Sequence, residues 1–121
     1  MGMFDDLFEK FTEIEDGNYV VKIEGFTREK TKNNVWPIRW QLKAVDEVKG
    51  VLPTKFNHVE SDVGFRILLN ELKQLGFQKP KTPKELESIL HSLIGALVEV
   101  EIFTTDQEAD YRVVRFVRRV Y

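Results

Sequence analysis

The sequence contains no cysteine, which excludes a disulfide scaffold, a thiolate metal site and a cysteine nucleophile. It also has no apolar run long enough to cross a membrane, and acidic residues stand near its start where a signal peptide needs a basic flank. Its 121 residues are the length of one domain. These features predict a soluble, single-domain, cytoplasmic protein without a membrane partner.

Catalytic motifs are lacking as well. The seven glycines match neither a dinucleotide-binding nor a phosphate-binding loop. The two histidines, His58 and His91, are expected to be structural. Glu99 and Glu101 suit a metal-dependent hydrolase only weakly, because a spacing of two is typical of the solvated face of a strand. We therefore predict a protein that is not an enzyme and has no metal or cofactor.

Hydrophobic periodicity predicts five strands, with two helices between the third and the fourth. The strands are expected at residues 19–26, 36–44, 51–59, 97–103 and 111–121, and the helices at 62–75 and 83–94. This order, β-β-β-α-α-β-β, is that of the mainly β, five-stranded OB-fold barrel. The rival interpretation is an α+β roll with both helices on one face of an open sheet. Residues 17–121 form the predicted domain, and residues 1–16 precede it as a short acidic amphipathic segment.

The strand patterns also predict which side chains face the core. Gly25 interrupts the first strand, where glycine commonly permits a bulge or a bend. Phe26 is expected to be exposed, whereas Trp40 alternates with polar residues and is expected in the core. In the third strand, Lys55 and Asn57 are expected on the polar outer face.

The net charge of −2 is an average over segments of opposite sign. Residues 1–16 hold six acids and one base, and residues 59–110 hold ten acids and five bases, so each segment sums to −5. Residues 17–58 hold eight bases and four acids, and residues 111–121 hold four arginines and no acid, so each of these sums to +4. The two basic segments are either one binding surface in the fold or separate solvated strand faces.

Binding of a single-stranded nucleic acid requires a cationic groove for phosphates and flat aromatic faces for bases. The first three strands and the last one carry residues of both kinds. The candidate residues are Arg28, Lys30, Lys32, Trp36, Arg39, Gln41, Lys43, Lys55, Asn57, Arg112 and Arg115. The sequence therefore favours single-stranded DNA as the partner. The alternative is an OB-like module that binds other proteins and has no affinity for DNA.

Several motifs, in this order, resemble the phage DUF669-type family of single-stranded DNA-binding proteins. They are Phe4-Asp5-Asp6-Leu7-Phe8, Asp16-Gly17-Asn18-Tyr19, Thr31-Lys32-Asn33-Asn34, Ile38-Arg39-Trp40-Gln41-Leu42 and Gly50-Val51-Leu52. The resemblance covers nearly the whole chain. It implies an OB-type fold and sequence-tolerant binding of single strands during phage DNA replication or recombination, in the cytoplasm of the bacterial host cell.

The acidic segment places Phe4, Leu7, Phe8 and Phe11 on one side of a predicted helix. It has three interpretations: a helix packed on the barrel, a tail that recruits phage or host replication and recombination proteins, or a competitor that occupies the cationic groove until DNA displaces it. The sequence also leaves a homodimer open.

Overall fold

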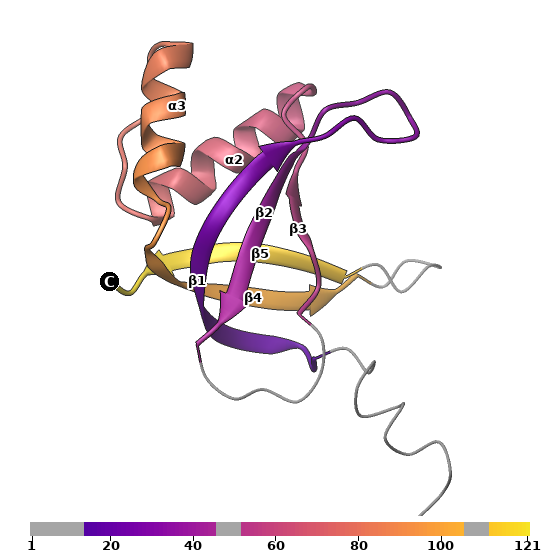
Figure 1. Cartoon of the computed structure of the whole chain (residues 1–121), viewed down its shortest axis with the longest axis vertical. Coiled ribbons are helices and arrows are strands. Elements are labelled where there is room, and N and C mark those ends of the chain that lie inside the picture. The colour runs from indigo at the N-terminus through magenta and orange to yellow at the C-terminus, as the bar shows by residue number, and fades with distance from the viewer. Residues whose placement is uncertain (1–13, 46–51, 106–111) are drawn as a thin grey trace, which may run out of the picture.

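The computed structural model describes residues 14–45, 52–105 and 112–121, and in these residues one antiparallel five-stranded sheet is accompanied by two helices (Figure 1). In chain order the elements are β1 (Gly17–Arg28), β2 (Ile38–Ala44), β3 (Lys55–Asn57), α2 (Asp62–Gln74), α3 (Pro83–Ser92), β4 (Leu97–Thr104) and β5 (Arg112–Arg119). The mainly β class and the predicted order of elements are confirmed. Neither of these helices is long and apolar enough to cross a membrane.

Strand β1 is the centre of the sheet, whose order is β3-β2-β1-β4-β5. Its first half pairs with β4, from Gly17 opposite Ile102, and its second half pairs with β2, up to Arg28 opposite Ile38. In Figure 1, β2 and β3 consequently run across β4 and β5, and β1 bends to join both pairs.

The predicted irregularity at Gly25 is confirmed by a shift of register between Ile23 and Gly25. A Cβ atom at Gly25 would lie 2.9 Å from the side-chain oxygen of Gln41, so the glycine lets that amide approach β1 closely. The extra residue of a bulge reverses which side chains face inward beyond it. Phe26 therefore points into the interior, where its ring centroid lies 5.6 Å from that of Trp40, and the prediction that Phe26 is exposed was wrong.

Both helices begin where the sequence predicted. Ser61 Oγ accepts a hydrogen bond from the Gly64 amide at 3.0 Å, and Thr82 Oγ1 accepts one from the Glu85 amide at 3.1 Å, so each helix has a hydroxyl N-cap. The first turn of α2 lies against the chain that leaves β3, because a Cβ atom at Gly64 would be 1.8 Å from the carbonyl oxygen of His58. A glycine is therefore required at this contact.

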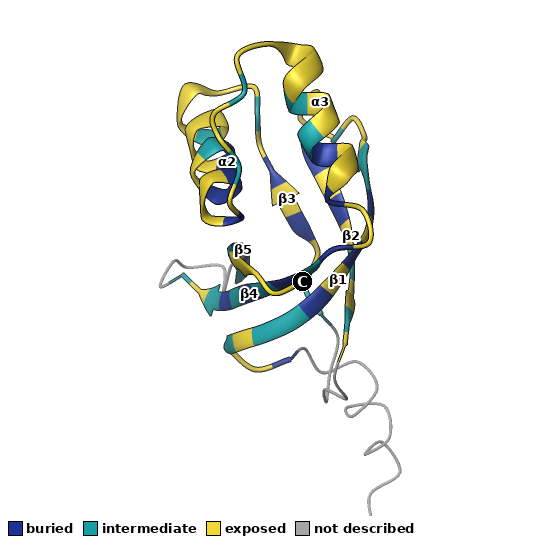
Figure 2. Ribbon diagram, turned by 90° about the vertical axis from the view of Figure 1, so that its left-hand side faces the viewer, coloured by how far each residue is buried: buried dark blue, intermediate teal, exposed yellow. Residues whose placement is uncertain are grey.

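The core lies between the inner face of the sheet and the helices, with α2 contributing more than α3 (Figure 2). Its most deeply buried apolar side chains are Val21, Ile23, Leu68, Leu72, Leu93, Val98, Val100, Ile102 and Phe116. Trp40 is also buried, at 2% exposed, which confirms its predicted place in the core. In α3 only Leu90 is buried, so most of that helix is exposed in Figure 2.

Strands β3 and β5 are the two edges of the sheet, and no ladder joins them in the described residues. Side chains connect them instead. Lys55 Nζ donates to the carbonyl oxygen of Val114 at 2.8 Å and forms an ion pair with Glu71 Oε2 at 2.7 Å. The same carboxylate oxygen accepts a hydrogen bond from the Phe116 amide at 2.8 Å. Glu71 of α2 and Lys55 of β3 thus hold β5 in place.

The connection extends into the core through Asn57. Its Nδ2 donates to Glu71 Oε1 at 2.7 Å, and its Oδ1 accepts from the indole nitrogen of Trp40 at 2.8 Å. We call Trp40, Lys55, Asn57 and Glu71 the polar network. All four side chains are buried. Burial lowers the pKa of the Lys55 ammonium from its ordinary value, and the adjacent Glu71 carboxylate opposes that shift.

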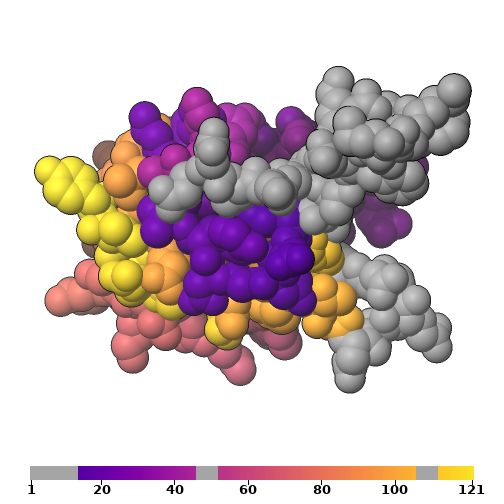
Figure 3. Space-filling view, turned by 90° about the horizontal axis from the view of Figure 1, so that it is seen from below, coloured from indigo at the N-terminus to yellow at the C-terminus, as the bar shows by residue number. Residues whose placement is uncertain are grey.

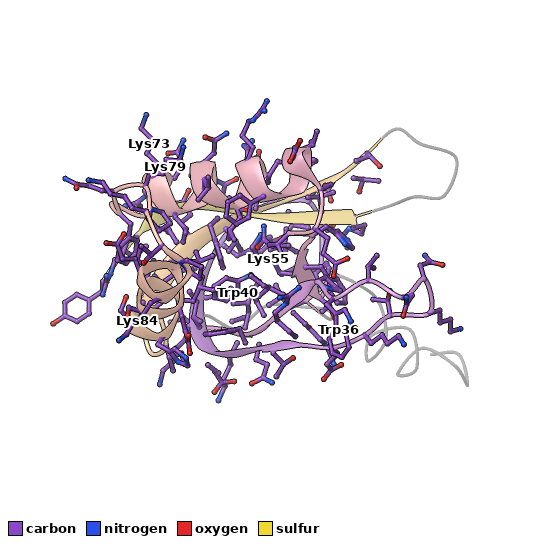
Figure 4. All side chains as sticks on the ribbon, turned by 90° about the horizontal axis from the view of Figure 1, so that it is seen from above. Trp36, Trp40, Lys55, Lys73, Lys79 and Lys84 are labelled. Atoms are coloured by element: carbon purple, nitrogen blue, oxygen red, sulfur yellow. The ribbon has the colours of Figure 1, made fainter. Side chains whose placement is uncertain are left out.

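The prediction that Lys55 and Asn57 project from the outer face of the third strand was therefore wrong. Figure 4 shows Lys55 beside Trp40 in the middle of the molecule, and Lys55 is 2% exposed. The sequence predicts the alternation of β3 but reverses its faces, because hydrophobicity alone places Phe56 inside. The carboxylate that makes a buried lysine tolerable comes from α2, which the pattern of the strand does not reveal.

We expect the polar network to be sensitive to the loss of one partner. In the Lys55→Met variant, Glu71 keeps its charge in the interior without a cation, which costs roughly 3–5 kcal/mol of unfolding free energy. The double variant Lys55→Met/Glu71→Gln carries no buried charge and keeps an amide oxygen for Asn57 or Phe116, so it should be more stable than Lys55→Met. Urea unfolding of the three proteins measures both effects. A double variant no more stable than the single one would contradict this account.

Candidate nucleic-acid interface

The outer face of β1, β2 and β3 brings together Arg39, Gln41 and Lys43, three of the residues that the sequence proposed for binding. Antiparallel pairing places Lys22 opposite Lys43, and Arg39 lies between Thr27 of β1 and Phe56 of β3. Residues directly opposite each other in an antiparallel pair point to the same side of the sheet. Arg39, Lys43 and Phe56 therefore share one surface, together with Lys22, which the sequence analysis did not select.

Two aromatic side chains, Phe56 of β3 and Trp36 just before β2, are exposed. Phe56 is 42% exposed and its ring stacks on His58, with 6.4 Å between ring centroids. Trp36, which the sequence proposed for stacking, is 45% exposed. Phe56 was missed because its alternation with Lys55 and Asn57 was taken to bury the phenylalanine. Flat rings open to solvent on a cationic surface are suited to stack on bases.

Trp36 is held by its backbone, so the point from which its exposed ring projects is fixed. The Arg28 guanidinium donates to the Trp36 carbonyl oxygen, at 3.0 Å from Nε, and the Trp36 amide donates to Glu60 Oε1 at 2.7 Å. Arg28 and Glu60 are themselves 3.7 Å apart. The structure thus places Arg28 beside Trp36 as a residue that positions it, and part of the arginine's hydrogen-bonding capacity is already used.

The hairpin loop between β1 and β2 carries Lys30 and Lys32. It is closed by hydrogen bonds from the Thr31 amide to the Val35 carbonyl at 2.9 Å and from the Asn34 amide to the Thr31 carbonyl at 3.0 Å. Asn34 has a φ of 63°, a left-handed conformation that asparagine adopts more readily than most residues. Both lysines are exposed on this compact loop.

The cations of this surface differ in whether a carboxylate lies within ion-pair distance. In the described part of the chain, Lys22, Lys30, Lys32 and Lys43 have no carboxylate within ion-pair distance. Arg39 lies 3.6 Å from Glu29, and both side chains are about half exposed, so solvent weakens this pair. Gln41 is exposed between Arg39 and Lys43 on β2, opposite Gly25 of β1. Four free lysines and one weakly paired arginine therefore surround Phe56 and the loop.

Three arginines of β5, in contrast, are each paired with an acid. Arg112 Nη2 lies 2.8 Å from Asp16 Oδ1, Arg118 Nε lies 2.9 Å from Glu99 Oε1, and Arg115 contacts Glu101. Glu99 also accepts from Asn18 at 2.8 Å. The first half of β1 adjoins β4 on this lower face of the molecule (Figure 3). Arg112 and Arg115 thus belong to a charge-balanced surface, so the two basic segments do not combine into one free cationic surface.

The ion pairs lower the pKa values of two of these carboxyls. The hydrogen bond from Arg112 lowers the pKa of Asp16, and those from Thr104 add to the effect. The hydrogen bond from Asn18 lowers the pKa of Glu99, and Arg118 acts in the same direction. In the folded protein both groups hold their charge to lower pH than in the unfolded chain.

The described residues contain no group of three or more histidine or acidic side chains arranged to hold a metal ion. A hollow of about 180 Å³ lies between β2 and residues 52–55, beside the candidate interface. Its lining includes Arg39 and Gln41, which the sequence proposed for binding.

Comparison of the chain with models of known protein families and with curated proteins finds no match.

The lowered carboxyl pKa values predict a pH dependence of stability. Protonation of Asp16 or Glu99 breaks its pair, so the stabilisation is present above their ordinary pKa values of 3.8 and 4.5 and is lost as the pH falls through the lower values of the folded state. Asp16→Asn and Glu99→Gln should therefore be less stable than the wild type at pH 7, and the difference should shrink toward pH 2. Urea midpoints measured across this range test the prediction.

Glu24→Gln is the matched control, because Glu24 is exposed and has no ion pair in the described residues. A difference for Asp16→Asn that stays constant from pH 7 to pH 2 would contradict the assigned role of the pair with Arg112.

Proposed function

We propose that this protein binds single-stranded DNA, largely without sequence specificity, on the outer face of β1, β2 and β3. The observation that carries the proposal is the exposure of Trp36 and Phe56 beside lysines that no carboxylate neutralises in the described residues. A cationic path for the backbone combined with aromatic platforms for bases is the chemistry of sequence-tolerant single-strand binding.

We further propose that the sheet is an OB-type barrel. The strand order β3-β2-β1-β4-β5, a central β1 shared by both halves and a helix between β3 and β4 support this assignment. In this interpretation the polar network replaces the ladder between β3 and β5, since Lys55 and Glu71 already join the two edges. OB folds bind oligonucleotides over strands 2 and 3 and the adjoining loops, and in this chain Lys30, Lys32, Arg39 and Lys43 lie on those elements.

Each part of the proposed site has a distinct role. Lys22, Lys30, Lys32 and Lys43 contact phosphates, and Arg39 joins them when the strand displaces Glu29. Trp36 and Phe56 stack on bases, Gln41 offers a neutral hydrogen-bonding group between them, and Arg28 positions Trp36. Lys55 and Asn57 stay outside the site because they are buried, and Arg112 and Arg115 because acids neutralise them.

The biological setting that we propose is phage DNA replication or recombination in a bacterial host cell, with membership of the phage single-stranded DNA-binding family that the sequence motifs resemble. A protein that coats single strands without reading their sequence is suited to both processes, because the exposed strands there have arbitrary sequence. A protein-interaction module remains the alternative, and the binding experiment below separates the two.

Tryptophan fluorescence gives a direct test, because Trp40 is 2% exposed and Trp36 is 45% exposed. Oligo-dT should quench the emission of Trp36, and added salt should reverse the quench. With about five phosphate contacts, the plot of log K against log salt concentration should have a slope near −3.5, since each contact contributes about −0.7. Absence of both quenching and a gel shift at low salt, or equal affinity for duplex DNA, would refute the proposal.

Two variants locate the site. Phe56→Ala should lower the affinity for oligo-dT by roughly 5- to 150-fold, the equivalent of about 1–3 kcal/mol for one stacked base. Lys43→Glu should weaken binding and make the salt slope less steep. Lys84→Glu is the matched control, because it makes the same charge change on α3, on the far side of the molecule from Trp36 (Figure 4). Equal losses for Lys43→Glu and Lys84→Glu would place the site elsewhere.

A further inference from the structure

A second surface of the molecule, beside the two helices, has the character of a docking groove and shares only Arg28 with the proposed DNA site. A cleft of about 740 Å³ lies between α3, the start of α2 and the end of the β1–β2 hairpin. Its apolar lining consists chiefly of Phe26, Ile38, Val59, Phe65, Leu86 and Leu90. Phe65 is 36% exposed, and α3 offers Leu86 to the cleft along a helix that is otherwise largely solvent-exposed (Figure 2).

Free lysines border this cleft. Lys81 lines the cleft itself and also a neighbouring hollow of about 650 Å³, which Lys79 and Lys84 line as well. None of the three lysines has a carboxylate partner among the described residues. In Figure 4, Lys79 and Lys84 lie at the periphery near the two helices, on the side away from Trp36. Glu60 and Glu87 also line the cleft, but Glu60 is paired with Arg28 and Glu87 lies 3.7 Å from His91. The surface therefore combines an apolar groove with unpaired lysines beside it.

One segment of the chain has the complementary chemistry. Within residues 1–13, Phe4, Leu7, Phe8 and Phe11 recur at the spacing of one helical face, and the remaining positions hold four acids and one lysine. Apolar anchors at i, i+3, i+4 and i+7 are the pattern by which an amphipathic helix occupies a hydrophobic groove. Its acidic side would meet Lys79, Lys81 and Lys84, which favours this groove over the uncharged apolar surfaces of the molecule.

The geometry of β1 indicates that the segment reaches the groove of another molecule. Ile14, which follows the segment, is buried just before β1 begins at Gly17, whereas Phe26 lines the cleft near the end of that strand. The nine steps from Gly17 to Phe26 cover about 30 Å measured along the strand. A helix over residues 3–13 spans about 16 Å. A helix of that length joined to Ile14 would be shorter than the strand that separates Ile14 from the cleft, which favours the cleft of another molecule.

We propose that residues 1–13 of one copy dock in the cleft between α3 and α2 of a second copy. Reciprocal exchange of the two segments makes two identical contacts and closes a twofold dimer without leaving a free groove. The proposal does not depend on DNA binding, because it uses neither Phe56 nor the lysines of the outer sheet face.

Complementation between two full-length variants tests the exchange. Phe8→Asp places a charge on the apolar side of the segment and leaves the cleft unchanged. Leu86→Asp places a charge in the lining of the cleft and leaves the segment unchanged. In sedimentation velocity the wild type should form dimers, and each variant alone should shift to the sedimentation coefficient of a monomer. A mixture of the two variants should regain a heterodimer, because one intact segment then meets one intact cleft. Fluorescent labelling of one variant detects the mixed species.

Controls separate docking from damage to the fold. Val63→Asp introduces the same charge at a position of α2 that is 67% exposed and does not line the cleft, so it should leave the dimer intact. If circular dichroism shows that Leu86→Asp is unfolded, the surface variant Lys81→Glu/Lys84→Glu takes its place in the mixture. Lys22→Glu/Lys43→Glu should keep the dimer while losing affinity for oligo-dT, which separates this proposal from the proposed function. A wild type that stays monomeric at its highest soluble concentration, or a mixture that forms no heterodimer, would overturn the exchange.

Discussion

The fold depends on one buried ion pair, Lys55 with Glu71. Hydrogen bonds between strands hold four of the five strand-to-strand boundaries that a closed barrel would need, but β3 and β5 have no ladder between them in the described residues. The ammonium of Lys55 binds the Val114 carbonyl, and the Glu71 carboxylate binds the Phe116 amide, so each partner satisfies a backbone group of β5. The pair is therefore both a link between the sheet edges and the anchor of α2, and each charge is tolerated in the interior only because the other is present.

The same interaction decides what the outer surface presents. Because successive residues of a strand point to opposite faces, the inward position of Lys55 and Asn57 forces Phe56 outward. Phe56 then lies beside Arg39, on the face that carries Lys43. The inward position of Lys55 thus removes that lysine from the proposed DNA site and adds the ring of Phe56 to it. The burial of Lys55 in β3 therefore exposes the ring of Phe56, the next residue.

Which basic residues remain unpaired depends on the acids that lie near them in the fold, and only partly on the net charge of their segment of the sequence. The arginines at the end of the chain looked like a free basic surface, but Asp16, Glu99 and Glu101 come from other strands to meet them. The reverse holds for residues 59–110, whose sum is strongly acidic. Lys79, Lys81 and Lys84 of that segment stand without an acidic partner in the described residues, beside an apolar cleft. The net charges of sequence segments therefore do not reveal the unpaired lysines near the cleft, and they overstate the free charge of the β5 arginines.

In the described residues, the sequence by itself determined the order of the strands and helices and the approximate bounds of all of them except the third strand, which covers only Lys55–Asn57 of the predicted 51–59. It also determined the caps at Ser61 and Thr82, the irregularity at Gly25 and the buried place of Trp40. These are set by local periodicity, capping and backbone freedom, which neighbouring residues contain. Only the tertiary structure decided which face of β3 is inside, that Phe26 turns inward beyond the bulge, and which arginines remain free. Each of these depends on a partner from a distant element, such as Glu71 for Lys55, and no local pattern specifies that partner.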